Sequence, residues 1–444
     1  MQIVNALEAQ FHVTQRQRLL RQLAPNSVCV VPAARLQTRS NDTEYLFRQD
    51  SDFWYLTGFH EPDAWLILSN SSDYNNEYSV LACLAKDELA EIWQGRRVGP
   101  EAATDKFLVD DTCATDDIEW ALHDIIDGHD NLYFALGNDA QADELVQAVL
   151  EKLRSAPKQS KHAPTSIIDI RPLLHEMRLI KQPEELAVMR RVAQISAEAH
   201  CRAMREVSRA EYEYQLEAAI LHEFAYNGAR HAAYNSIVGS GENACILHYN
   251  ENDAALRKGD LVLIDAGAEL YGYAADITRT FPVSGQFSEP QKALYQLVLD
   301  AQLAALGQLR PGNTISQAMM ACLRVLVAGL VELEILEGNV ETLIEEKAYQ
   351  RYFMHGLGHW LGLDVHDVGN YKIDDQDRPL KPGMALTVEP GLYINAKAEV
   401  PAEYCGIGIR IEDDIVITDD GHEVLTDGVP KTVDAIEALI SAHA

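Results

Sequence analysis

The order of segments after residue 175 most constrains what this chain can fold into. Two helical stretches, residues 182–207 and 210–228, precede strand-like runs at 234–240, 260–267 and 271–283. The order then restarts with helical stretches at 289–309 and 315–336 and strand-like runs at 385–393 and 407–418. A repeated helix-helix-strand order favours one domain built from two similar halves, related by a pseudo-twofold axis.

The preceding residues have a different organisation. Short strand-like runs such as SVCVVPA, WLILSN and NLYFALG alternate with helical stretches such as DIEWALHDIIDG, which predicts one α/β domain. A polar connector containing proline, SAPKQSKHAPTS, follows and marks a boundary. We therefore predict an α/β (α+β) chain with domains at residues 1–175 and 176–444.

Charge, cysteine content and hydropathy narrow the class of protein. The formal net charge of −31 argues against a nucleic-acid partner, because phosphate binding needs a basic surface. The seven cysteines include no C-x-x-C pair, which favours reduced thiols over a disulfide framework or a thiolate zinc site. No uninterrupted apolar run is long enough to cross a membrane, and the first twenty residues lack the order of a signal peptide, so we expect a cytoplasmic protein without a membrane partner.

Four carboxylates interrupt strongly apolar strands of the second domain. They are Asp265, Asp276, Glu389 and Glu412. Each has an ordinary explanation, such as a turn after Asp265 or an ion pair between Glu412 and Arg410. An unpaired charge in such a strand costs on the order of several kcal/mol. A shared metal cluster would satisfy all four carboxylates at once.

The segment HGLGHWLGLDVHD adds three histidines, His355, His359 and His366. Its glycines oppose a helix, so we expect strand or loop, with each histidine facing its own way. One imidazole with four carboxylates would make five ligands, and the four negative charges would balance two divalent cations. Oxygen-rich ligation without thiolate favours Mn²⁺, Co²⁺ or Fe²⁺, and such paired ions are typical of hydrolases.

The motifs around these residues resemble a known family. DAGAELYGYAADITRTFPV, HGLGHWLGLDVHDVG, TVEPGLY and GIGIRIEDDIVIT resemble the proline-specific metallopeptidases of the pita-bread fold, most closely the aminopeptidase P family. FRQDSDFWYLTGF, EIWQGRRVG and NSIVGSGENACILHY extend the resemblance over nearly the whole chain. It implies an N-terminal creatinase-like α/β domain followed by a pseudo-twofold pita-bread metallopeptidase domain.

The resemblance also implies roles for individual residues. The ligands of two metal ions, usually manganese, would be Asp265, Asp276, His359, Glu389 and Glu412. The catalytic residues would be His248, His366 and Glu389. Substrate would contact His355, Tyr393, Arg410 and Trp93. Trp93 would reach the active site of a neighbouring subunit in a homodimer or homotetramer; the alternative is that Trp93 is an ordinary core residue.

The implied activity is release of the N-terminal residue from peptides with proline in second position, by a water activated between two metal ions. Such peptides are the expected partners. Three alternatives stay open: a dipeptidase specific for Xaa-Pro (prolidase), a catalytically inactive pita-bread binding protein, and a metal-free amidinohydrolase of the creatinase type.

Overall fold

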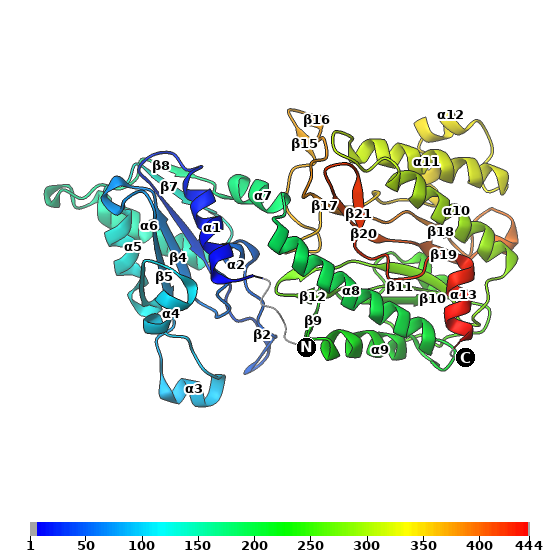
Figure 1. Ribbon diagram of the computed structural model, residues 1–444, viewed down its shortest axis with the longest axis horizontal. Helices are drawn as coiled ribbons and strands as arrows, with labels where there is room; N and C mark the ends of the chain where they lie inside the picture. The colour runs from blue at the N-terminus through cyan, green and yellow to red at the C-terminus, as the bar shows by residue number, and fades with distance from the viewer. Residues whose placement is uncertain (1–6, 443–444) are drawn as a thin grey trace. The chain divides into compact units, whose positions relative to one another are not determined.

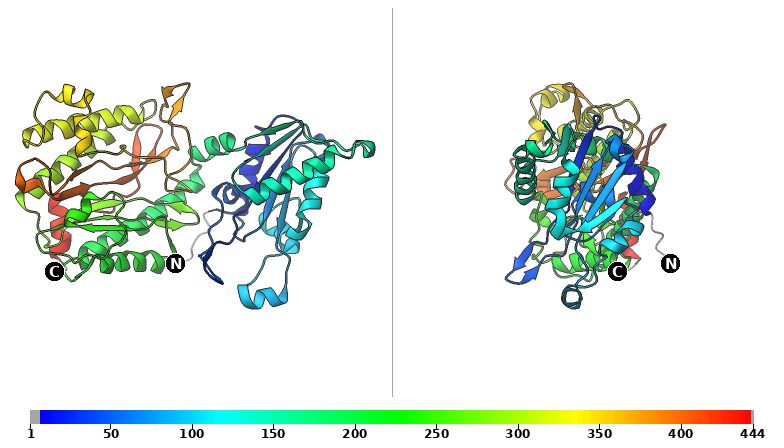
Figure 2. Two further views of the ribbon diagram at one scale, coloured as in Figure 1. Left: turned by 180° about the vertical axis from the view of Figure 1, so that it is seen from behind. Right: turned by 90° about the vertical axis from the view of Figure 1, so that its left-hand side faces the viewer.

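The computed structural model describes residues 7–442 of the chain, shown in Figure 1 and, from two further sides, in Figure 2. It divides into two compact units, Met1–Arg178 and Leu179–Ala444. The boundary predicted from the sequence, between residues 175 and 176, lies close to this division. Residues 1–6 and 443–444, which belong to the two predicted domains, lie outside the described residues.

The first unit contains a six-stranded mixed sheet in the order β6-β5-β4-β1-β7-β8. Its strands are β1 (Ser27–Pro32), β4 (Trp65–Ser69), β5 (Tyr78–Cys83), β6 (Asp111–Ala114), β7 (Asn131–Phe134) and β8 (Ser166–Ile168), beside a short ribbon of β2 (Thr38–Ser40) and β3 (Thr43–Glu44). The helices are α1 (Ala9–Leu20), α2 (Ser51–Thr57), α3 (Glu88–Gln94), α4 (Pro100–Phe107), α5 (Ile118–Ile126), α6 (Ala140–Arg154) and α7 (Arg171–Leu179).

The core of this unit forms where α5 and α6 cover one face of the sheet. Val28 and Val30 of β1 and Ile67 of β4 pack with Leu122 of α5 and Val146 of α6 in one buried cluster. Alternate residues of β1 and β4 share that face, as the period of two in a strand requires. The opposite face carries α1 and α2, as Figure 2 shows.

The second unit places its strands between two pairs of helices, as Figure 1 shows. The helices are α8 (Pro183–Glu206), α9 (Glu213–Tyr226), α10 (Glu289–Leu306), α11 (Ile315–Glu332), α12 (Val340–Glu345) and α13 (Val433–Ser441). The strands of the first half are β9 (His231–Ala232), β10 (Ile237–Ser240), β11 (Leu261–Asp265), β12 (Ala268–Leu270), β13 (Tyr273–Ala274) and β14 (Thr278–Pro282). Those that follow are β15 (Lys372–Ile373), β16 (Gln376–Asp377), β17 (Ala385–Val388), β18 (Gly391–Ile394), β19 (Ile407–Arg410), β20 (Asp413–Ile417) and β21 (His422–Val424).

The two halves have similar sheets that meet at one seam. The first half has a three-stranded sheet in the order β10-β11-β14, and the second has one in the order β17-β20-β21. Across the seam, the backbone N–H of Glu412 donates to the carbonyl oxygen of Thr278 at 3.0 Å, and the N–H of Arg410 donates to Thr280 Oγ1 at 3.2 Å. Residues from both halves are thereby brought to one place.

The histidine-rich segment has no helix, as predicted, and follows the edge of β17. The N–H of Thr387 donates to the carbonyl oxygen of His359, and Trp360 bridges Leu386. Gly358 lies so close to β17 that a Cβ there would come within 1.9 Å of the carbonyl oxygen of Thr387. Glycine is therefore required for this close approach.

One described helix, α11, is long and apolar enough to cross a membrane when length and composition alone are considered. Core helices of globular proteins pass the same test. Here Cys322, Leu326 and Leu330 of α11 are buried, and the helix packs against α10. The helix is therefore partly buried within the fold of the second unit.

Candidate active site

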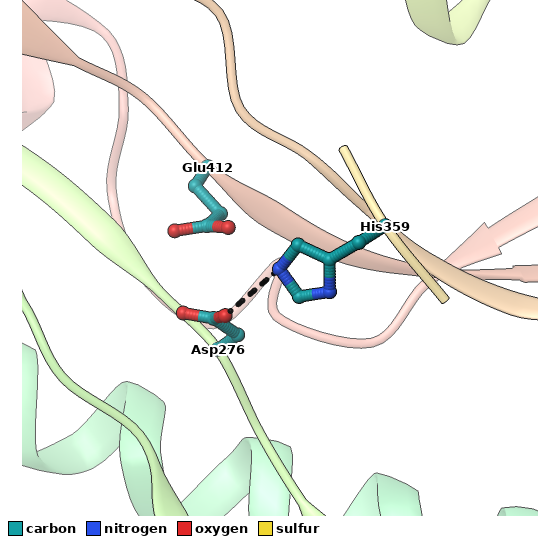
Figure 3. Close-up of side chains that lie close together, drawn as sticks. All are labelled: Asp276, His359 and Glu412. Atoms are coloured by element: carbon teal, nitrogen blue, oxygen red, sulfur yellow. Dashed lines mark ion pairs between the residues drawn. The ribbon is translucent and has the colours of Figure 1, made fainter. Parts of the chain in front are cut away.

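Asp276, His359 and Glu412 form the centre of the site (Figure 3). Each offers one ligand atom, and these atoms all lie within 4.8 Å of one another. Asp276 precedes β14 in the first half, whereas His359 and Glu412 come from the second half. The chain therefore assembles three potential metal ligands at the seam between its halves.

The ring of His359 has one orientation for chemical reasons. Its Nδ1 lies 3.0 Å from the carbonyl oxygen of Trp360, which can only accept, so Nδ1 carries a proton. Nε2 then points toward the carboxylates, 3.4 Å from Asp276 Oδ2 and 3.7 Å from Glu389 Oε1. A backbone contact that fixes the ring in this way is typical of histidine ligands of metals.

Asp265 and Asp276 are linked by Tyr234, which the sequence analysis missed. The Tyr234 hydroxyl lies 2.6 Å from Asp265 Oδ1 and also contacts Asp276 Oδ1. Burial and the two carboxylates raise the pKa of Tyr234 well above its usual value, so the phenol stays protonated and donates. The available signal was its position shortly before β10, which pairs with Asp265 at Ile237.

Electrostatics explain why this group of side chains needs a cation. Burial, followed by neighbouring carboxylates, raises the pKa of Asp276 and Glu412, and burial raises that of Glu389 to about 7. Burial alone would lower the pKa of His359, but Asp276 and Glu389 raise it to about 9. Protons thus take the place of missing positive charge. Carboxylates and one imidazole suit divalent ions, so the residues present fit a metal site.

Arg410 connects the carboxylates of the site with a series of hydrogen bonds that leads to His355. Its guanidinium donates to Asp265 Oδ2 at 2.6 Å and to the Tyr393 hydroxyl at 2.9 Å. The Tyr393 hydroxyl lies 2.8 Å from Nε2 of His355, whose Nδ1 faces the carbonyl oxygen of Gly356 at 2.8 Å. Because that carbonyl only accepts, Nδ1 carries the proton and Tyr393 donates to Nε2. Burial lowers the pKa of His355 to about 4, so the ring is neutral.

The alternative of an ion pair between Glu412 and Arg410 is not found among the described contacts. Arg410 contacts Asp265, as above, whereas Glu412 Oε2 accepts from Thr278 Oγ1 at 2.7 Å. The neighbouring Asp413 is paired instead with Arg279 at 2.7 Å, and both of these side chains are completely buried. Sequence reasoning missed this pair, although Arg279 shares a predicted strand face with Ile277 and Phe281, which was a signal that it needed a buried partner.

The two remaining catalytic candidates are exposed. The His366 ring lies 4.2 Å from the His359 ring, centroid to centroid, at an interplanar angle of 76°. Burial, His359 and His248 lower the pKa of His366. His248 follows the helical turn Gly241–Cys245 and acts electrostatically on both His355 and His366. The structure thus gathers all the predicted site residues of the second unit.

Trp93 belongs to the first unit and is not in its core. It lies on α3 with 86% of its surface exposed. The alternative that Trp93 is an ordinary core residue is therefore wrong.

The fold and the site define a two-domain metallopeptidase. Residues 187–419 match metallopeptidase family M24, and residues 12–133 match the aminopeptidase P N-terminal domain. Because the first match covers more than half of the chain, the chain belongs to family M24. The expected α/β (α+β) fold, with an N-terminal creatinase-like domain before a pita-bread domain, is confirmed.

Full-length relatives define the group within that family. The chain is 53% identical over 428 residues to the Xaa-Pro aminopeptidase of Escherichia coli (strain K12), covering 96% of this chain and 97% of that one. It is 47% identical over 427 residues to that of Haemophilus influenzae, covering 96% of each. A zinc-substituted E. coli aminopeptidase P in complex with product matches with a TM-score of 0.96 at 52% identity over 99% of each chain. This chain is a metal-dependent Xaa-Pro aminopeptidase that binds divalent metal ions.

Proposed function

We propose that the chain releases the first residue from Xaa-Pro-Yaa and longer peptides, and that it uses two Mn²⁺ ions to do so. The ligands would be Asp265, Asp276, His359, Glu389 and Glu412. The observation that carries this proposal is the convergence of Asp276, His359 and Glu412, whose ligand atoms lie within 4.8 Å of one another. Glu389 lies 3.7 Å from the same imidazole, and Asp265 is linked to Asp276 by Tyr234.

Divalent ions supply such a site with a water of lowered pKa and with a Lewis acid for the scissile carbonyl. Glu389 accepts the proton of the attacking water. Its carboxyl is half-buried beside His355 Nδ1 at 3.7 Å and His359 Nε2 at 3.7 Å. Burial raises its pKa to about 7 in the metal-free site. Divalent ions bound beside it would lower that pKa, so the carboxylate would be ionised and able to accept a proton near neutral pH.

His366 and His248 donate to the oxygen that becomes negative during attack. His366 suits this role because its lowered pKa leaves a neutral ring, which carries one N–H, at neutral pH. Its ring lies beside that of His359. The described contacts include no ion pair between His366 and a carboxylate. Both His366 and His248 are exposed, so either can reach a bound peptide.

Recognition of proline would use the hydrogen-bonded series Arg410–Tyr393–His355. A bond before proline is a tertiary amide with no N–H, so a site that requires a donor from the substrate rejects it. In this chain the His355 Nδ1 proton is already used by Gly356 and its Nε2 by Tyr393. Both ring nitrogens of His355 are therefore satisfied without any hydrogen bond from the substrate nitrogen. A pocket lined by these side chains can accept the pyrrolidine ring.

We also propose that the protein is a homodimer or homotetramer in the cytoplasm. The exposed α3 presents Leu89, Ile92 and Trp93 with 74%, 73% and 86% of their surfaces exposed. Three large apolar side chains on one seven-residue helix are typical of an interaction surface. We expect Trp93 to contact the site of a neighbouring subunit. Trp93→Ala should then raise KM for tripeptides, measured together with subunit number by analytical ultracentrifugation; unchanged values of both would remove this role.

The alternatives predict different responses to chelation. The proposed enzyme should lose hydrolysis of Xaa-Pro-Yaa peptides after exhaustive treatment with a chelator and regain it best with Mn²⁺, when Mn²⁺, Co²⁺, Fe²⁺ and Zn²⁺ are compared. Hydrolysis of creatine that resists the chelator would instead support an amidinohydrolase. A protein without stoichiometric metal and without hydrolysis would be an inactive binding protein.

A further inference from the structure

We propose that Lys181 and Asp367 are positioning residues for the hydrolysis, and that their buried ion pair fixes the loop that presents His366. Lys181 Nζ donates to Asp367 Oδ2 at 2.8 Å, and each side chain has only 1% of its surface exposed. Asp367 directly follows His366. The inference rests on the donor role proposed above for His366.

Lys181 is itself held by the backbone of the second unit. It lies between α7 and α8, and its N–H donates to the carbonyl oxygen of Gly383 at 2.9 Å. Ile180 forms a bridge with Met384, which directly precedes β17. The backbone of Lys181 is thus attached to the segment that leads into β17, and His359 lies along that strand. A charge at a fixed point in the protein can set the position of a loop.

Asp367 closes the loop that begins at His359. Its N–H donates to the carbonyl oxygen of Trp360 at 2.8 Å. Gly362 in the same loop has no room for a side chain, since a Cβ would lie 2.2 Å from Asp367 Oδ2 and 2.9 Å from Lys181 Cε. The ion pair therefore fills the interior of the loop. The Asp367 carboxylate is buried there, whereas the adjacent His366 is exposed.

The same entry to α8 also holds the strand that leads to Asp276. Glu185 accepts from the N–H of Gln182 at 2.8 Å and from the Tyr273 hydroxyl at 2.9 Å. The N–H of Ala274, next to Tyr273, donates to the carbonyl oxygen of Gly362 at 2.8 Å. The loop that carries His366 and the segment that carries Asp276 are thus both held near the start of α8.

A buried ion pair is weak evidence for a role in stability, because apolar residues of similar size often replace it at no cost. Its directional contacts are suited to fixing a geometry, and displacement of a catalytic group by about 1 Å can cost on the order of 10²-fold in rate. Loss of the pair should therefore act on kcat through His366.

The test is a double-mutant cycle on Lys181 and His366, measured on Gly-Pro-Ala with the Mn²⁺-loaded full chain. Lys181→Met should lower kcat about tenfold or more, as expected for a displaced catalytic group, with KM and metal content close to those of the wild type. In the His366→Ala background the same change should cause little further loss. An equal loss in both backgrounds would overturn the inference.

Lys181→Met removes the ammonium group that Asp367 contacts and can destabilise the fold, so Lys181→Met/Asp367→Asn provides a second route. This double variant removes both charges of the pair and should recover the melting temperature while kcat stays low. Recovery of both would make the pair merely structural. Lys161→Met removes a more exposed Lys–Asp pair of 2.6 Å in the first unit. It controls for the loss of a paired lysine away from the site and should leave kcat unchanged. A wild-type kcat in His366→Ala alone would instead contradict the proposed role of His366.

Discussion

Asp276 is the residue on which the contacts of the site converge. Its two carboxylate oxygens face His359 Nε2 and the Tyr234 hydroxyl, while its backbone N–H donates to the Asp414 carboxylate at 3.1 Å. Glu412 approaches from the other half of the domain and is 2% exposed. Each carboxylate is therefore buried where its charged form needs a nearby cation.

Removal of one of these ligands should abolish activity without unfolding the chain. We expect Asp276→Ala and Glu412→Ala to lose hydrolysis because each deletes a ligand, while each also relieves repulsion in a metal-free site. The measurements are turnover of Gly-Pro-Ala, metal content by mass spectrometry and the melting temperature. Normal metal content with retained turnover would contradict the assignment. Glu389→Gln is the matched variant: it keeps size but loses basicity, so turnover should fall even where metal remains.

The histidines should separate into two groups. We expect His359→Ala to reduce metal content, because its Nε2 faces Asp276 and Glu389. His366→Ala and His248→Ala should keep metal and lower kcat by about 10²–10³, the range for loss of one oxyanion donor. Parallel measurement of metal content and kcat decides the matter. Equal loss of metal in all three variants would contradict the separation of roles.

At the scale of elements, the sequence predicted the position of one carboxylate correctly and of three others incorrectly. Asp265 ends β11, as the apolar run indicated. Asp276, Glu389 and Glu412 were expected inside strands but lie in breaks, before β14, between β17 and β18, and before β20 respectively. A period-two pattern cannot reveal such a break, because the N–H of Glu412 pairs with Thr278 from the other half.

The start of α8 should give the chain a measurable pH dependence of stability. Glu185 belongs to the capping box at this helix terminus and is 1% exposed. Burial raises its pKa from 4.5 to about 7, so the folded chain binds this proton more tightly than the unfolded chain. The stabilisation is complete below pH 4.5 and is lost as the pH rises through about 7.

We therefore expect Glu185→Gln to be less sensitive to pH than the wild type. Between pH 5 and pH 8 the free energy of unfolding of the wild type should fall relative to the variant by on the order of a few kcal/mol. Denaturant unfolding at both pH values measures the difference, and the other titrating groups cancel in the comparison. Parallel pH profiles would show that Glu185 does not carry this proton.

At the scale of the whole molecule, the repeated order of elements predicted two halves, and the resemblance predicted which residues meet between them. Composition and periodicity alone could not give the partners of buried charges. Proximity in sequence suggested Glu412 as one possible partner of Arg410, but Arg410 contacts Asp265, which lies far away in the chain. Tyr234, Arg279 and Lys181 were missed for the same reason, since their contacts depend on tertiary structure.

Substrate length is a property of the whole chain, because a dipeptidase must enclose the end of its substrate and hold the proline carboxylate, whereas an aminopeptidase must let the rest of the peptide leave. The similarity to Xaa-Pro aminopeptidases extends over 96% of this chain and includes both units. We therefore expect kcat/KM to be highest for Gly-Pro-Ala, lower for Gly-Pro and much lower for Gly-Ala-Ala, with Mn²⁺ present throughout. A preference for Gly-Pro over Gly-Pro-Ala would indicate a prolidase, and equal values for the two tripeptides would remove the specificity for proline.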